Sequence, residues 1–272
     1  MPPADSSALR KRVVSALLLV PVTLGAAYYG RPLWDVLVGV MGALMAWEWA
    51  RLCCGGRLTR IGLGTIAMAP AAVAAAAILD VGAGLIVVAA GTLLVIVAGR
   101  IDPASNRKWL ALGVVYVGLP CLALSWLRAM PEQGWLTLLW VLGLVCATDT
   151  GAYIAGRKIG GPKLAPRISP NKTWAGLFGG MAAAGLVGLG LSVVVPDVSP
   201  WLAMPLGAVL AVVEQVGDLF ESAVKRRFGA KDSSNLIPGH GGVLDRVDGL
   251  LTVSLAVSAL SWVAGHTSLI WR

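Results

Sequence analysis

Apolar runs long enough to cross a lipid bilayer recur along the chain, separated by short segments with charge, proline or glycine. Helices of a soluble domain would each keep a polar face, which these runs lack. The pattern predicts nine membrane-spanning helices, at residues 13–29, 34–50, 61–79, 83–98, 109–127, 135–155, 174–195, 201–221 and 249–264. The predicted fold class is therefore all-α, a polytopic integral membrane protein.

The runs continue without a soluble domain, internal repeat or low-complexity tail, so we interpret residues 1–272 as a single integral membrane domain. Residues 1–130 are expected to form scaffold helices that face lipid or make oligomer contacts. Residues 131–272 are expected to carry the chemistry. The basic start and first apolar run resemble a secretion signal, but the run is longer than a usual signal core, so we expect a retained first helix.

Composition supports a lipid environment. Of 272 residues, 57% are hydrophobic and 13% are charged, against roughly 25% charged in soluble domains. The formal net charge of +8 favours anionic partners such as lipid head groups or phosphates. The cysteines lack metal-ligand spacing and are interpreted as small apolar fillers: Cys53, Cys54, Cys121 and Cys146. The glycines of the seventh run are expected to allow close helix packing: Gly176, Gly179, Gly180, Gly185, Gly188 and Gly190.

Basic residues are distributed unevenly among the connections. The N-terminal segment and the second, fourth, sixth and eighth connections hold three, three, three, five and five Lys or Arg residues, which leaves only Arg31, Arg128 and Arg272 elsewhere. Because basic connections stay on the cytoplasmic side of a membrane, this alternation predicts a cytoplasmic N-terminus. The sixth and eighth connections, the two longest, are then cytoplasmic as well.

The sixth run and its connection contain the first unusual chemistry. Asp149 lies inside the apolar pattern, where a carboxylate is costly unless it is paired or bound to metal; a helix cap or an inter-helix hydrogen bond is the alternative. The connection then interleaves basic residues with glycines and with Ser169, Asn171 and Lys172. Cations and close backbone approach suit a polyphosphate, whereas a plain positive-inside loop is the competing interpretation.

The eighth run and the segment after it concentrate acids. Glu214, Asp218 and Glu221 recur at intervals of four and three, which places them on one helix face. The following segment contains Lys231, Asp232, His240, Asp245, Arg246 and Asp248. Carboxylate oxygens of this kind suit Mg²⁺, whereas zinc is disfavoured because His240 has no cysteine beside it. His240 is either a phosphate contact or an ordinary hydrogen-bonding loop residue.

The residues from Ser222 to Asp248 resemble the signature of the phosphatidate cytidylyltransferase family. The matching positions are Ser222, Lys225-Arg226, Lys231-Asp232, Ser234, Ile237-Pro238, His240-Gly241-Gly242 and Asp245-Arg246-Val247-Asp248. A second block, Asp149 to Tyr153 and Ile168 to Trp174, is also similar to that family, with a departure at Ala175, where relatives often carry an acidic or amide residue. The first four apolar runs resemble that family only in their hydrophobic character.

The resemblance implies transfer of the cytidylyl group of CTP to phosphatidic acid in a bacterial inner membrane, with the active site in the cytoplasm. Mg²⁺ is the expected cofactor, K⁺ a candidate second cation, and a homodimer the expected assembly; nucleic acid is not an expected partner. The predicted metal ligands are Asp149, Asp218, Asp245 and Asp248. The predicted catalytic set is Asp218, Asp245, Asp248, Lys225 and Arg226, and the predicted substrate contacts are Lys163, Ser169, Asn171, Lys172, Lys231, Asp232, His240 and Arg246.

Other functions share some of these features. An ion-coupled transporter would also carry intramembrane acids and glycine-rich helices, but it predicts acids at mid-membrane and an internal repeat. A CTP-dependent lipid kinase would share the nucleotide chemistry and transfer the γ-phosphate instead. A purely structural scaffold would not need two charged cytoplasmic clusters.

Overall fold

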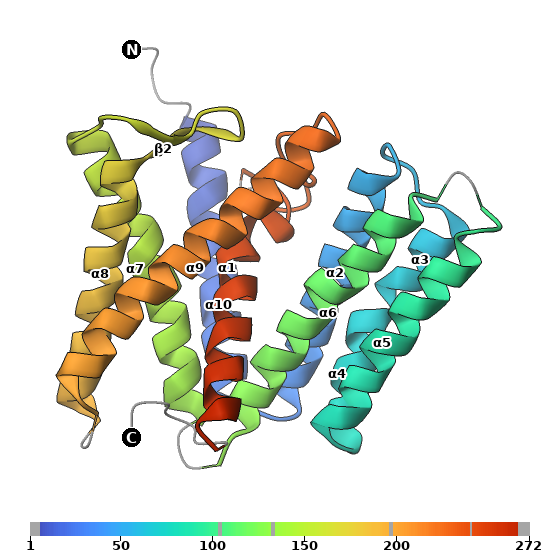
Figure 1. Ribbon diagram of the computed structural model, residues 1–272, viewed down its shortest axis with the longest axis horizontal. Helices are drawn as coiled ribbons and strands as arrows, with labels where there is room; N and C mark the ends of the chain where they lie inside the picture. The colour runs from blue at the N-terminus through green and yellow to red at the C-terminus, as the bar shows by residue number, and fades with distance from the viewer. Residues whose placement is uncertain (1–5, 103–104, 132–133, 196–197, 240, 266–272) are drawn as a thin grey trace. The chain divides into compact units, whose positions relative to one another are not determined.

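Figure 1 shows the computed structural model, which describes residues 6–102, 105–131, 134–195, 198–239 and 241–265. The elements in chain order are α1 (Ser6–Tyr29), α2 (Leu33–Cys53), α3 (Arg60–Ile66), α4 (Met68–Ile78), α5 (Val81–Ala98), α6 (Arg107–Ala129), α7 (Gly134–Lys158), β1 (Lys163–Ala165), β2 (Ser169–Thr173), α8 (Trp174–Val194), α9 (Pro200–Arg227) and α10 (Leu244–Val263). Each predicted span corresponds to a helix within this description, with the third formed by α3 and α4 together.

The all-α polytopic fold is confirmed. Within the described chain, eight helical segments are long and apolar enough to cross a membrane. The apolar part of α1, Leu17–Tyr29, is shorter than these segments. Two boundaries differ from the prediction in a useful way: α9 continues to Arg227 and α10 already begins at Leu244. Lys225 and Asp245 therefore lie on helices and not in the connection between them.

The chain divides into two compact units, Met1–Trp126 with Phe228–Val247, and Leu127–Arg227 with Asp248–Arg272. The segment after α9 thus groups with the N-terminal helices, although it carries much of the recognised motif. The functional division at residue 130 stays a prediction. The two units are described separately below.

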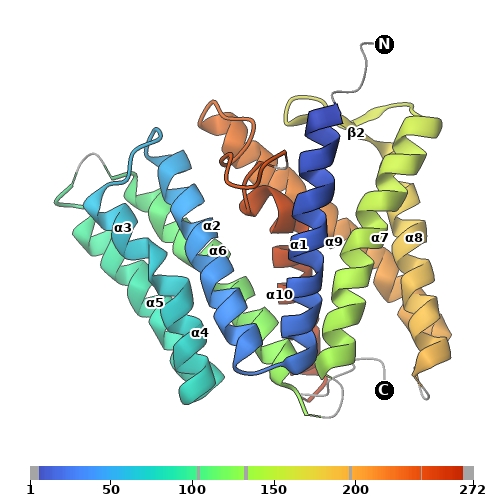
Figure 2. The same ribbon diagram turned by 180° about the vertical axis from the view of Figure 1, so that it is seen from behind.

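In the first unit, α2, α4, α5 and α6 pack around a core of alanine, valine and leucine side chains, among them Ala50, Ala72, Val88 and Leu110. Figure 2 shows α3, α4 and α5 beside one another. Side-chain oxygens cap the first turns of two helices, because the first backbone amides of a helix have no hydrogen-bond partner within it. Asp80 Oδ1 accepts a hydrogen bond from the Ala83 amide at the start of α5, and Thr59 caps α3 in the same way.

In the second unit, α8 packs closely against α7 and α9 along faces of small residues. A Cβ added at Gly179 would collide with Ala155, and one added at Gly188 would collide with the Ala203 carbonyl oxygen. The predicted role of the glycines is confirmed for most of them, but Gly190 faces open space. Cys53 and Cys121 are buried free thiols, in agreement with their interpretation as apolar fillers.

A short hairpin, which the sequence did not predict, joins α7 to α8 (Figure 1). Strand β1 pairs antiparallel with β2, with Lys163 opposite Thr173 and Ala165 opposite Ser169. Thr173 then caps α8, because its hydroxyl oxygen accepts a hydrogen bond from the Gly176 amide at 3.0 Å. The predicted phosphate-binding residues Ser169, Asn171 and Lys172 are therefore held on a strand, whose end is fixed to a helix.

Glycine packing in α8 gives a direct test of this arrangement. Gly188→Ala is expected to lower the free energy of unfolding by about 1–3 kcal/mol, because the new Cβ would overpack the contact with α9. Gly190→Ala, on the same helix but with no atom nearby, should leave stability unchanged or slightly raise it. Thermal unfolding of both variants in detergent checks this; equal effects would contradict the close α8–α9 contact.

Candidate active site

The acids predicted to share one face of α9 lie in the interior of the second unit. Glu214 and Glu221 are 1% and 0% exposed, and Asp218 between them is half-buried. Helix α10 approaches this face closely, since a Cβ added at Gly249 would meet the Glu214 side chain at 2.6 Å. The face is therefore an interior feature and not a solvated charge stripe.

The hairpin brings a lysine to this face. Lys172 of β2 lies with Nζ 2.5 Å from Asp218 Oδ2, and the Ser222 hydroxyl donates a hydrogen bond to Asp218 Oδ1 at 3.2 Å. Glu214 interacts electrostatically with Lys172, Asp218 and Asp149, which lies on α7. Residues predicted from two separate motif blocks thus meet in one cluster.

A second lysine comes from α9 itself. Lys225 is buried and its Nζ lies 2.8 Å from Glu221 Oε2, one turn earlier on the same helix. Asp248 of α10 interacts electrostatically with Asp218 and Lys225, and its side chain hydrogen-bonds with Glu221. We call these residues of the second unit the acid–lysine cluster: Asp149, Lys172, Glu214, Asp218, Glu221, Lys225 and Asp248.

The donor chemistry of the acid–lysine cluster fits Mg²⁺. It contains more carboxylates than lysines, and all its anionic donors are hard oxygens. No three His, Cys, Asp or Glu side chains in the described part of the chain are already arranged as a ligand set for a metal. Mg²⁺ does not require such a set, because it usually takes one or two carboxylates and completes its shell with water and substrate phosphate.

Asp245 belongs to the first unit, where its side chain accepts hydrogen bonds from the loop of residues 233–244 that leads into α10. Its Oδ2 accepts hydrogen bonds from the amides of Ser233 and Gly242, at 2.9 and 2.8 Å, and from the Ser233 hydroxyl. Gly241 precedes Gly242 with φ +85°, a conformation that favours glycine. The structure thus gives Asp245 a clear loop-fixing contact, and its predicted role as a metal ligand stays a prediction.

The loop lines a polar cavity of about 700 Å³ in the first unit. Two predicted substrate contacts, Lys231 and Arg246, contribute its cations, and Asp232 and Asn235 line it as well. An open cavity with two cations and few apolar walls is suited to a phosphate group. This places Lys231, Asp232 and Arg246 around one cavity, as the predicted substrate role requires.

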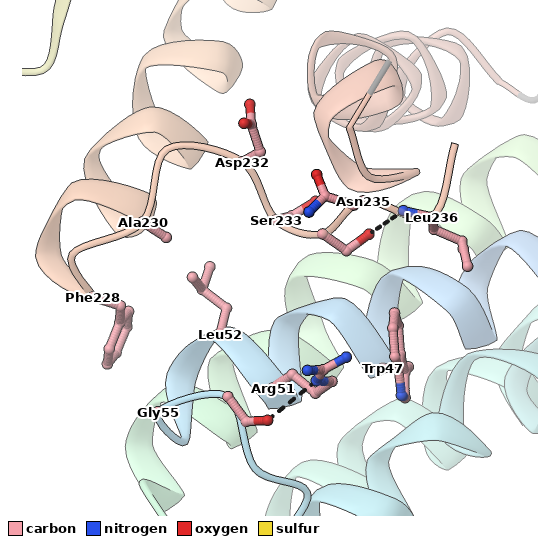
Figure 3. Close-up of a pocket in the computed structure, with 12 residues that line it drawn as sticks. Trp47, Arg51, Leu52, Gly55, Phe228, Ala230, Asp232, Ser233, Asn235 and Leu236 are labelled. Carbon is pink, nitrogen blue, oxygen red and sulfur yellow. Dashed lines mark hydrogen bonds between the residues drawn. The ribbon is translucent and has the colours of Figure 1, made fainter. Parts of the chain in front are cut away.

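A second cavity of the first unit, of about 490 Å³, has mostly apolar walls (Figure 3). Trp47 and Arg51 of α2 line it, with the Arg51 guanidinium 4.9 Å from the centre of the Trp47 ring. Arg51 Nε also donates a hydrogen bond to the Gly56 carbonyl oxygen at 3.2 Å. Asp232 and Asn235 line both cavities, so the loop contributes to each of them.

The remaining predicted residues occupy more exposed positions in the second unit. Arg226 is exposed, and its Nε donates a hydrogen bond to the Ile168 carbonyl oxygen beside the hairpin. Lys163 and Asn171 are exposed, whereas Ser169 is half-buried. The predicted contact at His240 lies outside the described residues.

The sequence prediction missed Glu48, which is completely buried on α2. It also named Glu214 and Glu221 only as part of an acidic face, without a site role. In each case the sequence shows an ionisable residue inside an apolar run. Burying such a residue in a membrane costs free energy, so residues of this kind are often functional. For Glu48 that signal was overlooked because α2 carries no part of the recognised motif.

Comparison with known proteins identifies the family of the chain. Residues 10–264 match the model of the cytidylyltransferase family. A phosphatidate cytidylyltransferase of Brucella suis is 40% identical over 95% of this chain and 94% of its own length, and one of Pseudomonas aeruginosa is 38% identical over 94% and 98%. A Staphylococcus epidermidis relative of the same name is 43% identical over 52% of this chain and 54% of its own. The chain therefore belongs to the cytidylyltransferase family.

Proposed function

We propose that this nucleotidyltransferase transfers the cytidylyl group of CTP to phosphatidic acid, forming CDP-diacylglycerol and pyrophosphate. The relatives that align over nearly the whole chain carry the name phosphatidate cytidylyltransferase, which supports this substrate pair. The observation that supports the proposal in the structure is the acid–lysine cluster, since it brings Lys225 and Asp248 of one motif block together with Asp149 and Lys172 of the other in the second unit.

The chemistry requires little covalent help from the protein. The attacking oxygen belongs to the lipid phosphate, which is already ionised, so no strong general base is needed. Transfer at a phosphate depends on positioning and on charge neutralisation. Lys172 and Lys225 can supply positive charge, and the ion pairs with Asp218 and Glu221 hold each ammonium group in place before substrate arrives. Lys231 and Arg246 of the polar cavity are proposed to bind phosphate oxygens.

We propose Asp149, Asp218 and Asp248 of the cluster as the residues that would hold Mg²⁺. The bound ion would neutralise phosphate charge as a Lewis acid. K⁺ is proposed as a second cation beside it. The Lys172–Asp218 and Lys225–Glu221 ion pairs place carboxylate oxygens of the cluster beside ammonium groups.

The proposed setting is a bacterial inner membrane, with the site open to the cytoplasm. The bacterial relatives and the strong bias of basic residues toward alternate connections support it. A homodimer remains the expected assembly, and the glycine-lined helices would permit it. An ion-coupled transporter has no specific observation in its favour, because the acids gather with lysines toward one end of α9.

A product assay tests the proposal. Purified protein with phosphatidic acid, Mg²⁺ and CTP labelled in the cytosine ring should give a labelled lipid and pyrophosphate, and a chelator should abolish the product. Release of labelled CDP together with a phosphorylated lipid would instead identify a CTP-dependent lipid kinase. Absence of any CTP-dependent lipid product would overturn the proposal.

A further inference from the structure

Glu48 is a fully buried carboxylate in the middle of a network of hydrogen bonds within the first unit. Its Oε1 accepts from the Val243 amide at 2.8 Å and from the Ser234 hydroxyl at 2.6 Å. Its Oε2 accepts from the Leu244 amide at 2.7 Å and from the Ser233 hydroxyl at 3.3 Å. Every donor lies within residues 233–244, from the loop after α9 to the first residue of α10, nearly 200 residues later in the chain.

The four hydrogen-bond donors around Glu48 suit a negatively charged side chain. Val243 and Leu244 present amides at the start of α10, where a helix has unpaired donors and favours negative charge. Among the described residues, no Lys or Arg pairs with Glu48, so hydrogen bonds alone compensate for its burial. A buried carboxylate is retained only where such donors offset its desolvation.

The contacts of Glu48 reach both ends of the loop. Ser233 and Ser234 lie near its beginning, and Val243 and Leu244 lie at its end, so one carboxylate holds the loop closed. Gly242 makes the fit tight, because a Cβ there would lie 2.6 Å from Glu48 Oε1 and would collide with the Ser233 hydroxyl. Asp245 adds its own contacts to Ser233 and Gly242, so two acids fix the same turn.

The loop fixed in this way carries much of the polar cavity. Lys231 and Asp232 directly precede the two serines, Asn235 follows them, and Arg246 lies two residues after Leu244. A shift of the loop would move both cations of that cavity. The same shift would alter the second cavity, because Ser233, Ser234 and Asn235 line it, and Ser233 and Asn235 can be seen in Figure 3.

We propose that Glu48 is a positioning residue, which sets the geometry of the substrate-phosphate cavity by tying both ends of the 233–244 loop to α2. This inference rests on the proposed function for its choice of substrate, CTP or the lipid phosphate. It gives α2, which carries no part of the recognised motif, a part in shaping the polar cavity of the first unit. Glu48 itself contacts neither substrate.

Glu48→Gln is the main test, because Gln keeps the size but offers one acceptor in place of two. We expect the KM for CTP or for phosphatidic acid to rise about tenfold or more, since charge-assisted hydrogen bonds to the loop are lost, with a smaller change in kcat. Ser234→Ala, a milder change, should shift the same KM in the same direction by a smaller factor. Asp35→Asn is the matched control, since Asp35 is also a buried acid of α2 but bonds to Arg31 and Ser125.

Hydrogen exchange on the full-length protein provides a readout that does not need turnover. Amides of residues 233–244 should exchange faster in Glu48→Gln than in the wild type, with no change at the α7–α8 hairpin. If the wild type makes no cytidylyl lipid, the proposed function fails, and faster exchange still supports the positioning role. Unchanged exchange and unchanged KM values in Glu48→Gln and Ser234→Ala would overturn the inference. It would also be overturned if Glu48→Gln lost folded protein while the folded fraction kept normal KM values.

Discussion

Asp248→Asn is expected to lower cytidylyl transfer by about a thousandfold or more, as when a group that stabilises transition-state charge is lost. Asp248 lies in α10 within the acid–lysine cluster, where it interacts with Asp218 and Lys225. Asn has nearly the same shape but no charge, so the protein should still insert and fold. The measurement is the rate of CTP turnover at saturating CTP and at a Mg²⁺ concentration that saturates the wild type, with unfolding temperature recorded in parallel.

The matched control for this change is Asp80→Asn. Asp80 caps α5 through its side chain, and Asn is an equally good cap, so both stability and activity should remain near wild type. A second comparison uses the metal: at higher Mg²⁺ concentration Asp248→Asn should regain part of its activity if it binds the ion weakly. Near-normal turnover in Asp248→Asn at ordinary Mg²⁺ would refute the proposed metal role.

Lys225→Met should destabilise the protein by about 3–5 kcal/mol, because it leaves the carboxylate of Glu221 buried after losing its cation. Activity should fall as well, since Lys225 is proposed to stabilise phosphate charge. Thermal unfolding in detergent measures the first effect, and turnover per folded molecule measures the second.

The double variant Lys225→Met/Glu221→Leu separates these two effects. Replacement of a buried ion pair by apolar side chains is often neutral or stabilising, so its stability should return toward that of the wild type. Its turnover should remain low, because no cation has been restored. A stable and fully active double variant would show that Lys225 has only a structural role.

The sequence was sufficient to predict the arrangement of spans, because a bilayer imposes a local rule. Each crossing needs a long apolar run whose backbone is paired internally, and this can be recognised within a short window of residues. The prediction of the site residues rested on motif positions. Asp218 was predicted from the acidic face of α9 and Lys172 from a motif block, and the structure pairs them, while their role in the site stays a prediction.

The hairpin and the ends of α9 and α10 were harder to predict. Charged and polar residues at these places break the apolar pattern, so the sequence pattern ended the α9 span too early and began the α10 span too late. In the structure, Lys225 is buried against Glu221 one turn away, which allows α9 to continue through charged residues. The hairpin is too short and too polar to give an alternating strand pattern.

By itself, the sequence of this protein determined a multi-pass helical fold, a strong asymmetry of basic connections and a motif typical of cytidylyl transfer. Only the tertiary structure decided which partner each acid takes: Asp218 meets Lys172 of the hairpin, Asp245 holds a loop, and Glu48 bonds to the start of α10. The physical reason is one of range. Hydrophobicity and helix periodicity act between near neighbours in the chain, whereas the partner of a buried charge is set by the packing of helices far apart in sequence.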